Sequence, residues 1–147
     1  MFQIVVDCRD ARAMTRFWAA ALSYDIEPPP QSFATWNDYW RSIGVPEDEL
    51  DADGDGSDSI RDPEGRGPRI WFQVVPEDKV VKNRIHLDLG VSGGRELSLE
   101  SRKERVDREV ERLVAAGAHK VRELFTEGID HYAVAMQDPE GNEFDVN

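Results

Sequence analysis

The sequence of 147 residues predicts an α+β fold made of two similar βαβββ modules within one domain. The turn Asp-Pro-Glu-Gly occurs at 62–65 and again 76 positions later, at 138–141. A strand that begins near Gln3 also recurs 83 positions later, near His86. Each small sheet would carry a helix on one face only, so the two free faces can together enclose a ligand cavity. We therefore expect modules at 1–78 and 79–147 that form a cupped, barrel-like cavity.

The first module opens with a strand and a helix. Residues 2–8 are a short apolar run with β-branched side chains, which predicts a strand. Asp10 is a suitable N-cap for the helix that follows. The apolar residues of this helix recur at helical spacing and predict a buried stripe: Met14, Phe17, Trp18, Ala21 and Leu22.

The remainder of the first module is expected to be mainly extended chain. Three prolines at 28–30 end the helical pattern and favour an extended segment. The aromatic-rich residues 35–43 predict a strand, a second strand ends at the turn at 62–65, and 69–75 predict a third. An acidic loop that contains glycine lies between these strands, at 46–58.

The acidic loop contains a pattern that resembles the opening of a calcium-binding EF-hand loop. Asp51, Asp53 and Asp55 alternate with other residues and are followed by Gly56. However, Asp62 stands where such a loop carries Glu, and no predicted helix pair flanks the segment. A solvated, mobile loop is therefore the better interpretation.

The second module repeats the order of the first. Residues 84–91 alternate between apolar and other side chains, which predicts a half-buried strand. Ser101 and Glu104 have the spacing of a capping box, so a helix is expected to begin there and to end with Gly117 as its C-cap. Three further strands are predicted at 121–125, 132–137 and 143–146.

Charge and composition exclude several classes of protein. Asp plus Glu number 30 against 18 Lys plus Arg, and the net charge of −12 disfavours binding to nucleic acid or to anionic membranes. No apolar run reaches the ~20 residues of a membrane span, and the first residues lack the basic region of a signal peptide. We therefore expect a cytoplasmic protein. Because Cys8 is the only cysteine, a disulfide framework and a cysteine zinc site are excluded.

Aromatic residues of the first module are candidate ligand contacts. On a strand, Trp36 and Trp40 would share one face and Tyr39 would lie on the other. Trp71 and Gln73 would likewise share the inward face of their strand. Aromatic walls suit flat or apolar ligands, so Trp36, Trp40, Trp71 and Gln73 are candidate ligand-binding residues. The alternative is that the tryptophans fill the core of a small barrel.

Several segments in the same order carry a family resemblance that spans nearly the whole chain. They are the sequences DCRD at 7–10, FWAAALSY at 17–24, GPRIWFQ at 67–73, VKNRIHLDL at 81–89, RLVAAGA at 112–118 and DPEGNEF at 138–144. The chain therefore resembles the vicinal oxygen chelate superfamily of glyoxalases, bleomycin-resistance proteins and extradiol dioxygenases, and most of all its bacterial glyoxalase-like proteins. This superfamily includes isomerases, dioxygenases, epimerases, lyases and metal-free drug-binding proteins, so the resemblance implies a fold and not one reaction.

The resemblance also implies positions for a divalent metal, with two ligands from each module. These positions fall on Gln3 and His86 in the first strand of each module and on Asp145 in the last strand. The fourth ligand is usually Glu, but the strand at 69–75 offers only Trp71 or Gln73, and Gln73 completes the candidate set. One imidazole, one carboxylate and two amides could hold Zn, Ni, Fe or Mn. The missing Glu disfavours a metal, and the alternative is a polar ligand site without one.

His86 and Asp88 are also candidate catalytic residues. An imidazole titrates near neutral pH and suits proton transfer there. Asp88 lies two residues after His86, so a strand would place both side chains on one face. The alternatives are that His86 and Asp88 form hydrogen bonds across a polar barrel interior, and that the Asp145 carboxylate faces solvent.

Three functions are compatible with these residues. The first is a glyoxalase-like protein or enzyme that binds a small molecule in the cavity between its modules. The second is a metal-free binding or sequestration protein of the drug-resistance type. The third is a metal-dependent lyase or isomerase acting on the thiol adduct of an α-oxoaldehyde, against which the missing Glu argues. The resemblance also implies a homodimer.

Overall fold

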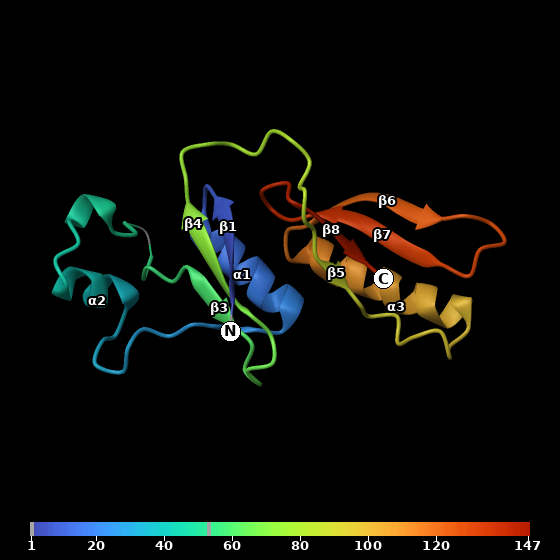
Figure 1. The fold of residues 1–147 in the computed structure, drawn as a ribbon, viewed down its shortest axis with the longest axis horizontal. Coiled ribbons are helices and arrows are strands. Elements are labelled where there is room, and N and C mark those ends of the chain that lie inside the picture. The colour runs from blue at the N-terminus through green and yellow to red at the C-terminus, as the bar shows by residue number, and fades with distance from the viewer. Residues whose placement is uncertain (1, 53) are drawn as a thin grey trace. The chain divides into compact units, whose positions relative to one another are not determined.

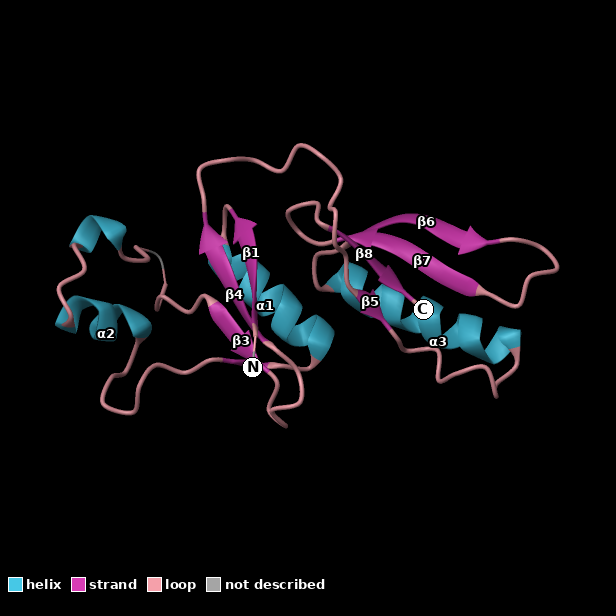
Figure 2. Cartoon of the chain, viewed as in Figure 1, coloured by secondary structure: helices cyan, strands magenta, loops and turns pink. Residues whose placement is uncertain are grey.

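Two four-stranded sheets, each with a long helix packed on one face, make up the structure, a computed structural model that describes residues 2–52 and 54–147 (Figures 1 and 2). The chain divides into two units, Met1–Asp78 and Lys79–Asn147. The predicted α+β class with two modules in one chain is confirmed. The barrel-like cavity expected between the modules stays a prediction. The helices of the described chain are too short or too polar to cross a lipid bilayer.

The sheet of the first unit has the strand order β1-β4-β3-β2. Its outer strand β1 runs parallel to β4, with Gln3 paired to Arg69 and Asp7 paired to Gln73. Ile70 and Phe72 are buried, whereas Trp71 and Gln73 lie on the other, more open face. The elements of this unit are β1 (Gln3–Cys8), α1 (Ala11–Leu22), β2 (Asp25–Ile26), α2 (Trp36–Ser42), a 3-10 turn (Glu47–Glu49), β3 (Ser59–Arg61) and β4 (Arg69–Val74).

Helix α1 begins where the sequence predicts. The Asp10 side chain accepts a hydrogen bond of 2.9 Å from the Ala13 N–H, as an N-cap does. The predicted stripe is buried at Met14, Phe17 and Trp18, and it packs against β3 and β4. This burial fixes α1 on one face of the sheet and leaves the other face open.

Residues 36–42 form helix α2, so the strand predicted at 35–43 is wrong. Thr35 caps the helix by accepting a hydrogen bond of 3.0 Å from the Asp38 N–H. On a helix, residues at i, i+3 and i+4 share a face, so Tyr39 lies beside Trp36 and Trp40 instead of opposite them. The ring centroids of these three residues are 4.9–5.7 Å apart, and their mutual packing stabilises the short helix.

The sheet of the second unit has the equivalent order β5-β8-β7-β6, with β5 parallel to β8. Helix α3 lies on one face and buries Val106, Val110 and Leu113 together with Phe144 of β8. A bulge between Lys120 and Arg122 interrupts the pairing of the outer strand β6. The elements of this unit are β5 (Asp88–Leu89), α3 (Leu99–Ala115), β6 (His119–Phe125), β7 (Tyr132–Gln137) and β8 (Glu143–Val146).

Two features of the second unit differ in detail from those that the sequence predicts. The strand predicted at 84–91 is reduced to Asp88–Leu89, and Ile85 is 83% exposed instead of half-buried. Helix α3 begins three residues earlier than the capping box predicts, because Ser98 accepts the capping hydrogen bond from the Ser101 N–H. Its C-cap is Ala116, and the adjacent Gly117 takes the positive φ of +113° that ends the helix.

The repeated Asp-Pro-Glu-Gly turns share one hydrogen-bond pattern. The Asp62 carboxylate accepts main-chain N–H groups of Glu64, Arg66 and Gly67, which holds the pKa of Asp62 below its ordinary value. Asp138 accepts the main-chain N–H groups of residues 140 and 142 in the same way. In both units, an aspartate at the first turn position organises the connection into the strand that pairs with the first strand of the unit.

Glu143→Gln is expected to lower the free energy of unfolding by about 1–2 kcal/mol at pH 7. The Asn83 N–H at 2.9 Å and the Lys79 ammonium at 3.0 Å stabilise the carboxylate and lower the pKa of Glu143 from 4.5 to about 2. Because the folded-state pKa is the lower one, this stabilisation is present above about pH 4.5 and disappears as the pH falls to about 2. Urea unfolding with a chelator present should therefore show the two proteins converging between pH 5 and 2.

The control for this prediction is Glu127→Gln, which removes the same charge from an exposed turn. It should leave the urea midpoint nearly unchanged at every pH. If the free energies of unfolding of wild type and Glu143→Gln differed by the same amount at every pH, the role given to the carboxylate charge would be contradicted.

Candidate functional site

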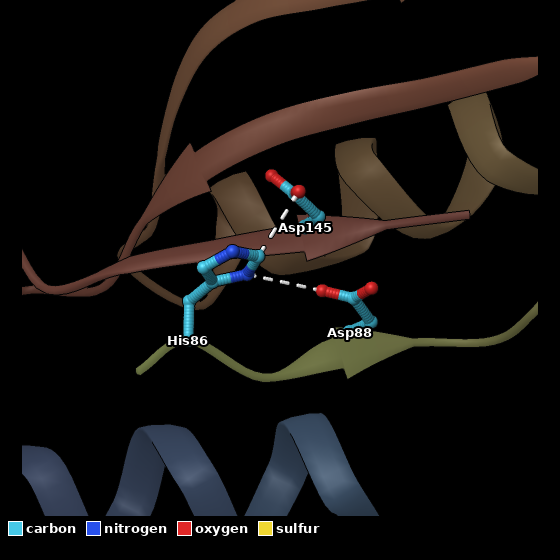
Figure 3. Close-up of side chains that lie close together, drawn as sticks. All are labelled: His86, Asp88 and Asp145. Atoms are coloured by element: carbon cyan, nitrogen blue, oxygen red, sulfur yellow. Dashed lines mark hydrogen bonds and ion pairs between the residues drawn. The ribbon is translucent and has the colours of Figure 1, made fainter. Parts of the chain in front are cut away.

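His86, Asp88 and Asp145 converge on the open face of the second sheet (Figure 3). His86 Nδ1 lies 3.1 Å from Asp88 Oδ1 and 3.9 Å from Asp145 Oδ2. One ligand atom from each residue lies within 4.8 Å of the other two. The side chains are 38%, 54% and 24% exposed, respectively, so the cluster is open to a ligand from solvent.

Strand pairing brings the two carboxylates together. Asp88 of β5 is directly opposite Asp145 of β8, and the next pair along is Leu89 with Val146. Leu89 and Val146 are buried on the helix side. Since successive side chains of a strand alternate between faces, Asp88 and Asp145 point to the open side. His86 precedes Asp88 by two residues, and its imidazole turns toward both carboxylates (Figure 3).

The donor atoms of this cluster fit a divalent cation. Two carboxylates placed directly opposite each other on neighbouring strands repel one another. A cation between them would offset this repulsion, and an imidazole nitrogen beside two carboxylate oxygens is a donor set that Mn²⁺, Fe²⁺, Ni²⁺ and Zn²⁺ accept. The sequence suggested His86 and Asp145 as ligands and Asp88 as a catalytic partner. The structure places Asp88 near enough to His86 and Asp145 to act as a third ligand.

A pocket of about 320 Å³ adjoins the cluster on the same face. His86 and Asp145 line it together with the cationic side chains of Lys82 and Arg122. Ala135 and Gln137 of β7 form part of the wall. The cluster therefore lies at the edge of a space large enough for a small ligand.

The first unit does not bring Gln3 and Gln73 together. Gln3 pairs with Arg69, whose guanidinium donates a hydrogen bond of 2.5 Å to Gln3 Oε1. Gln73 pairs with Asp7, four positions along the strand pair, which is roughly 13 Å at 3.3 Å per residue. The two amides of the candidate metal set therefore lie at opposite ends of β1 and β4.

Strand register identifies the residue of the first unit that corresponds to Asp145. When Gln3 is aligned with His86, Val5 corresponds to Asp88. Val5 pairs with Trp71, whereas Asp88 pairs with Asp145. Trp71 therefore stands where the second unit has a carboxylate, and its indole N–H donates to Asp58 Oδ2 at 2.7 Å.

The remaining candidate residues belong to helix α2 and the acidic loop. Trp36 donates its indole N–H to the Glu27 carbonyl oxygen at 2.9 Å, and Trp40 lines a cleft of about 670 Å³ within the first unit. Among the described residues of the acidic loop, Asp51 and Gly54 accept hydrogen bonds from the side-chain amide of Asn37 through their carbonyl oxygens. Asp53, part of the EF-hand-like pattern, lies outside the described residues.

Sequence reasoning did not single out Asn37. This residue is 9% exposed and anchors the acidic loop to α2 through its side-chain amide. A lone asparagine in an aromatic segment carries no recognisable pattern. Had 36–42 been assigned to a helix, the spacing of Asn37 and Trp40 would have placed both on one face.

Comparison with known proteins identifies similar chains. The family described as glyoxalase-like domain matches residues 3–147. A glyoxalase/bleomycin resistance protein/dioxygenase family enzyme from Burkholderia phytofirmans shares 20% identity and a TM-score of 0.57, covering 99% of this chain and 94% of that one. The fosfomycin resistance protein FosX from Listeria monocytogenes, a mutant solved with Mn(II) and a dihydroxypropylphosphonic acid, shares 12% identity and a TM-score of 0.58, covering 100% and 87%. A comparison with curated protein sequences finds no match.

Proposed function

Because the chain belongs to the glyoxalase-like domain family of the vicinal oxygen chelate superfamily, we propose that it binds a small molecule on the open face of its second sheet, beside a divalent cation held by His86, Asp88 and Asp145. The observation that carries this proposal is the convergence of one imidazole and two carboxylates within 4.8 Å. The similarity to FosX, whose structure contains Mn(II), supports the choice of cation.

The chain's own residues account for binding and orientation. A bound cation would supply positive charge that polarises an oxygen atom of the ligand. His86 and Asp145 line the adjoining pocket, so a ligand in that pocket would contact the cluster directly. Lys82 and Arg122 on the same wall balance the charges of Glu143 and Asp145, so a bound cation would leave a net positive charge that favours a ligand with an anionic group. The His86 imidazole also lines the pocket, where it is placed to exchange a proton with a ligand.

Titration of chelator-treated protein with Mn²⁺, followed by electron paramagnetic resonance, tests the proposal. We expect saturable binding of one ion per chain, and at least about 10-fold weaker binding in His86→Ala and Asp145→Asn. His119→Ala and Asp48→Asn, which change an exposed histidine and an exposed aspartate outside the cluster, are the matched controls. Absence of saturable binding, or equal weakening in the controls, would overturn the proposed cation site.

A metal-free binding protein of the drug-resistance type is the second candidate. The observation that favours it lies in the first unit, where Trp71 corresponds to Asp145 and the Gln3 amide oxygen accepts a hydrogen bond from Arg69. If Mn²⁺ does not bind but ligands still raise the melting temperature of the chelator-treated protein, this candidate is favoured. The metal-dependent lyase is less well supported, because neither Gln3 nor Trp71 supplies a further carboxylate. The homodimer stays a prediction.

A further inference from the structure

The chain segment that carries His86 is held in place by few contacts. Residues 79–87 precede β5 and form neither helix nor strand. The apolar side chains of Val80, Val81 and Ile85 are all at least 75% exposed, so packing against a core does not fix the segment. The position of the His86 imidazole therefore depends on the polar contacts of this segment.

Two hydrogen bonds join the main chain of residues 79–87 to β8. The Asp145 N–H donates to the Leu87 carbonyl oxygen at 2.9 Å. The Asn83 N–H donates to Glu143 Oε2, also at 2.9 Å. Within the described part of the chain, these are the only hydrogen bonds between this main chain and a strand. The first continues the pairing of the sheet, whereas the second depends on a single side chain.

The Glu143 carboxylate is itself held by an ion pair. Lys79 Nζ lies 3.0 Å from Glu143 Oε2, and the two side chains are 19% and 23% exposed, so most of the solvent is kept from the pair. The same ammonium group donates to the Val81 carbonyl oxygen at 2.8 Å. Lys79 and Glu143 therefore connect the start of the segment, and its middle at Asn83, to β8.

Glu143 lies on the face of β8 that carries the cluster without belonging to the cluster. It precedes Asp145 by two residues, so the two side chains share the open face, and both line the adjoining pocket. Among the described residues, the ligand atoms that converge within 4.8 Å come from His86, Asp88 and Asp145. The Glu143 carboxylate is instead engaged by residues 79–83, so it can act on the cluster through the chain that carries His86.

We propose that Glu143 is a positioning residue: together with Lys79, its carboxylate holds residues 79–87 against β8 and keeps the His86 imidazole beside Asp145. The proposal rests on the cation site proposed for the second unit and adds two residues that are not ligands of the ion. Residues behind the ligands of a metal orient those ligands, and their loss weakens metal binding. An imidazole on a loosely held segment would have to be ordered at the moment of binding, which costs free energy.

Charge and position predict opposite effects for a substitution of Lys79. Lys79→Gln removes a positive charge near a cation site, so charge alone predicts tighter Mn²⁺ binding. If Lys79 helps to hold the segment, the same change should weaken Mn²⁺ binding by about 10-fold. The matched control is Arg84→Gln, which removes the same charge from the same segment, at an exposed side chain that has no ion pair or hydrogen bond with the described residues. Arg84→Gln should bind Mn²⁺ at least as tightly as wild type, and equally tight binding by Lys79→Gln would overturn the proposal.

Pulsed electron paramagnetic resonance of the full-length chain at saturating Mn²⁺ reports the imidazole directly. Wild type should show nitrogen coupling to the bound ion, and His86→Ala should lack it. Lys79→Gln and Glu143→Ala should lose most of this coupling while circular dichroism shows that they are folded, an effect that a general loss of stability would not produce. Lys79→Gln keeps the test valid if Glu143→Ala does not fold. Full nitrogen coupling in Lys79→Gln would overturn the proposal.

Nuclear magnetic resonance of the metal-free protein separates this proposal from the cation site. The main-chain order parameters of residues 82–86 should be near 0.85 in wild type and in Arg84→Gln, and below about 0.6 in Lys79→Gln. Unchanged order parameters in Lys79→Gln would overturn the positioning role, whether or not Mn²⁺ binds. If Lys79→Gln releases the segment but wild type binds no Mn²⁺, the cation site fails and the role of Glu143 in holding the segment is supported.

Discussion

Asp138→Ala is expected to lower the free energy of unfolding by about 2–4 kcal/mol, because it removes a buried carboxylate and leaves the part-buried N–H groups of its turn without their acceptor. Asp138 is 0% exposed. Its carboxylate accepts the main-chain N–H of Glu140 at 3.0 Å, the main-chain N–H of Asn142 at 2.9 Å and the side-chain amide of Asn142 at 3.0 Å. Because the carboxylate itself is buried, water replaces this acceptor poorly, and urea unfolding should show a clear fall in the midpoint.

Asp62→Ala is the matched control for that prediction. The Asp62 carboxylate accepts three main-chain N–H groups as well, but residues 61–66 of this turn are more exposed than Asp138. Water can hydrogen-bond to the N–H groups that this substitution leaves, so the loss of stability should be clearly smaller. Equal losses for Asp62→Ala and Asp138→Ala would contradict the importance given to burial.

Phe144→Ala is expected to cost about 3–5 kcal/mol of unfolding free energy, the usual range for a large aromatic side chain in a core. Phe144 is 1% exposed and lies on β8 opposite Met136 of β7, on the face that α3 covers. The substitution removes the side chain that fills the space between the sheet and α3, and the rigid surroundings close only part of the cavity. Urea unfolding monitored by circular dichroism measures the loss.

Phe144→Leu is the conservative comparison, because leucine keeps most of the apolar volume. Phe144→Leu should lower the free energy of unfolding by less than about 1.5 kcal/mol. A loss of less than 1 kcal/mol for Phe144→Ala would indicate that the core beneath β8 relaxes far more than the burial of its neighbours suggests.

Strands with a buried centre were predicted most accurately from the sequence. The bounds of β7, Tyr132–Gln137, and of β8, Glu143–Val146, match the prediction. Both are inner strands of their sheet, so their apolar residues are held on two sides and local sequence pattern agrees with tertiary packing. The duplicated turn predicted two repeated modules, whereas the order in which the strands pair was not predicted from the sequence.

Two segments were predicted less well because local pattern and context disagree. The aromatic residues of 35–43 favour a strand by composition, but Thr35 with Asp38 forms a helix cap and the rings meet at helical spacing. The alternation at 84–91 favours a strand, but its neighbour β8 is only four residues long and pairs with two of these residues. The length of the neighbouring strand cannot be inferred from the sequence of residues 84–91 alone.

The candidate site of the second unit was also predictable only in part, because some of its contacts are local in the sequence and others are not. Proximity of His86 and Asp88 follows from their spacing, because residues two apart on extended chain share a face. The addition of Asp145 depends on a parallel pairing between distant segments, and the family resemblance suggested it. The burial of Asn37 and its hydrogen bonds to Asp51 and Gly54 depend on how the acidic loop folds over α2, and the sequence contains no signal for that arrangement.

The bulge in β6 has a consequence for aggregation. Outer strands with a long, regular row of free N–H and carbonyl groups are templates on which other chains can add strands and grow fibrils. In β6 the bulge between Lys120 and Arg122 breaks that regular row, and charged side chains at 120, 122 and 123 surround the break. Charge repulsion and the irregular backbone therefore protect the longest outer strand of the second sheet against fibril formation.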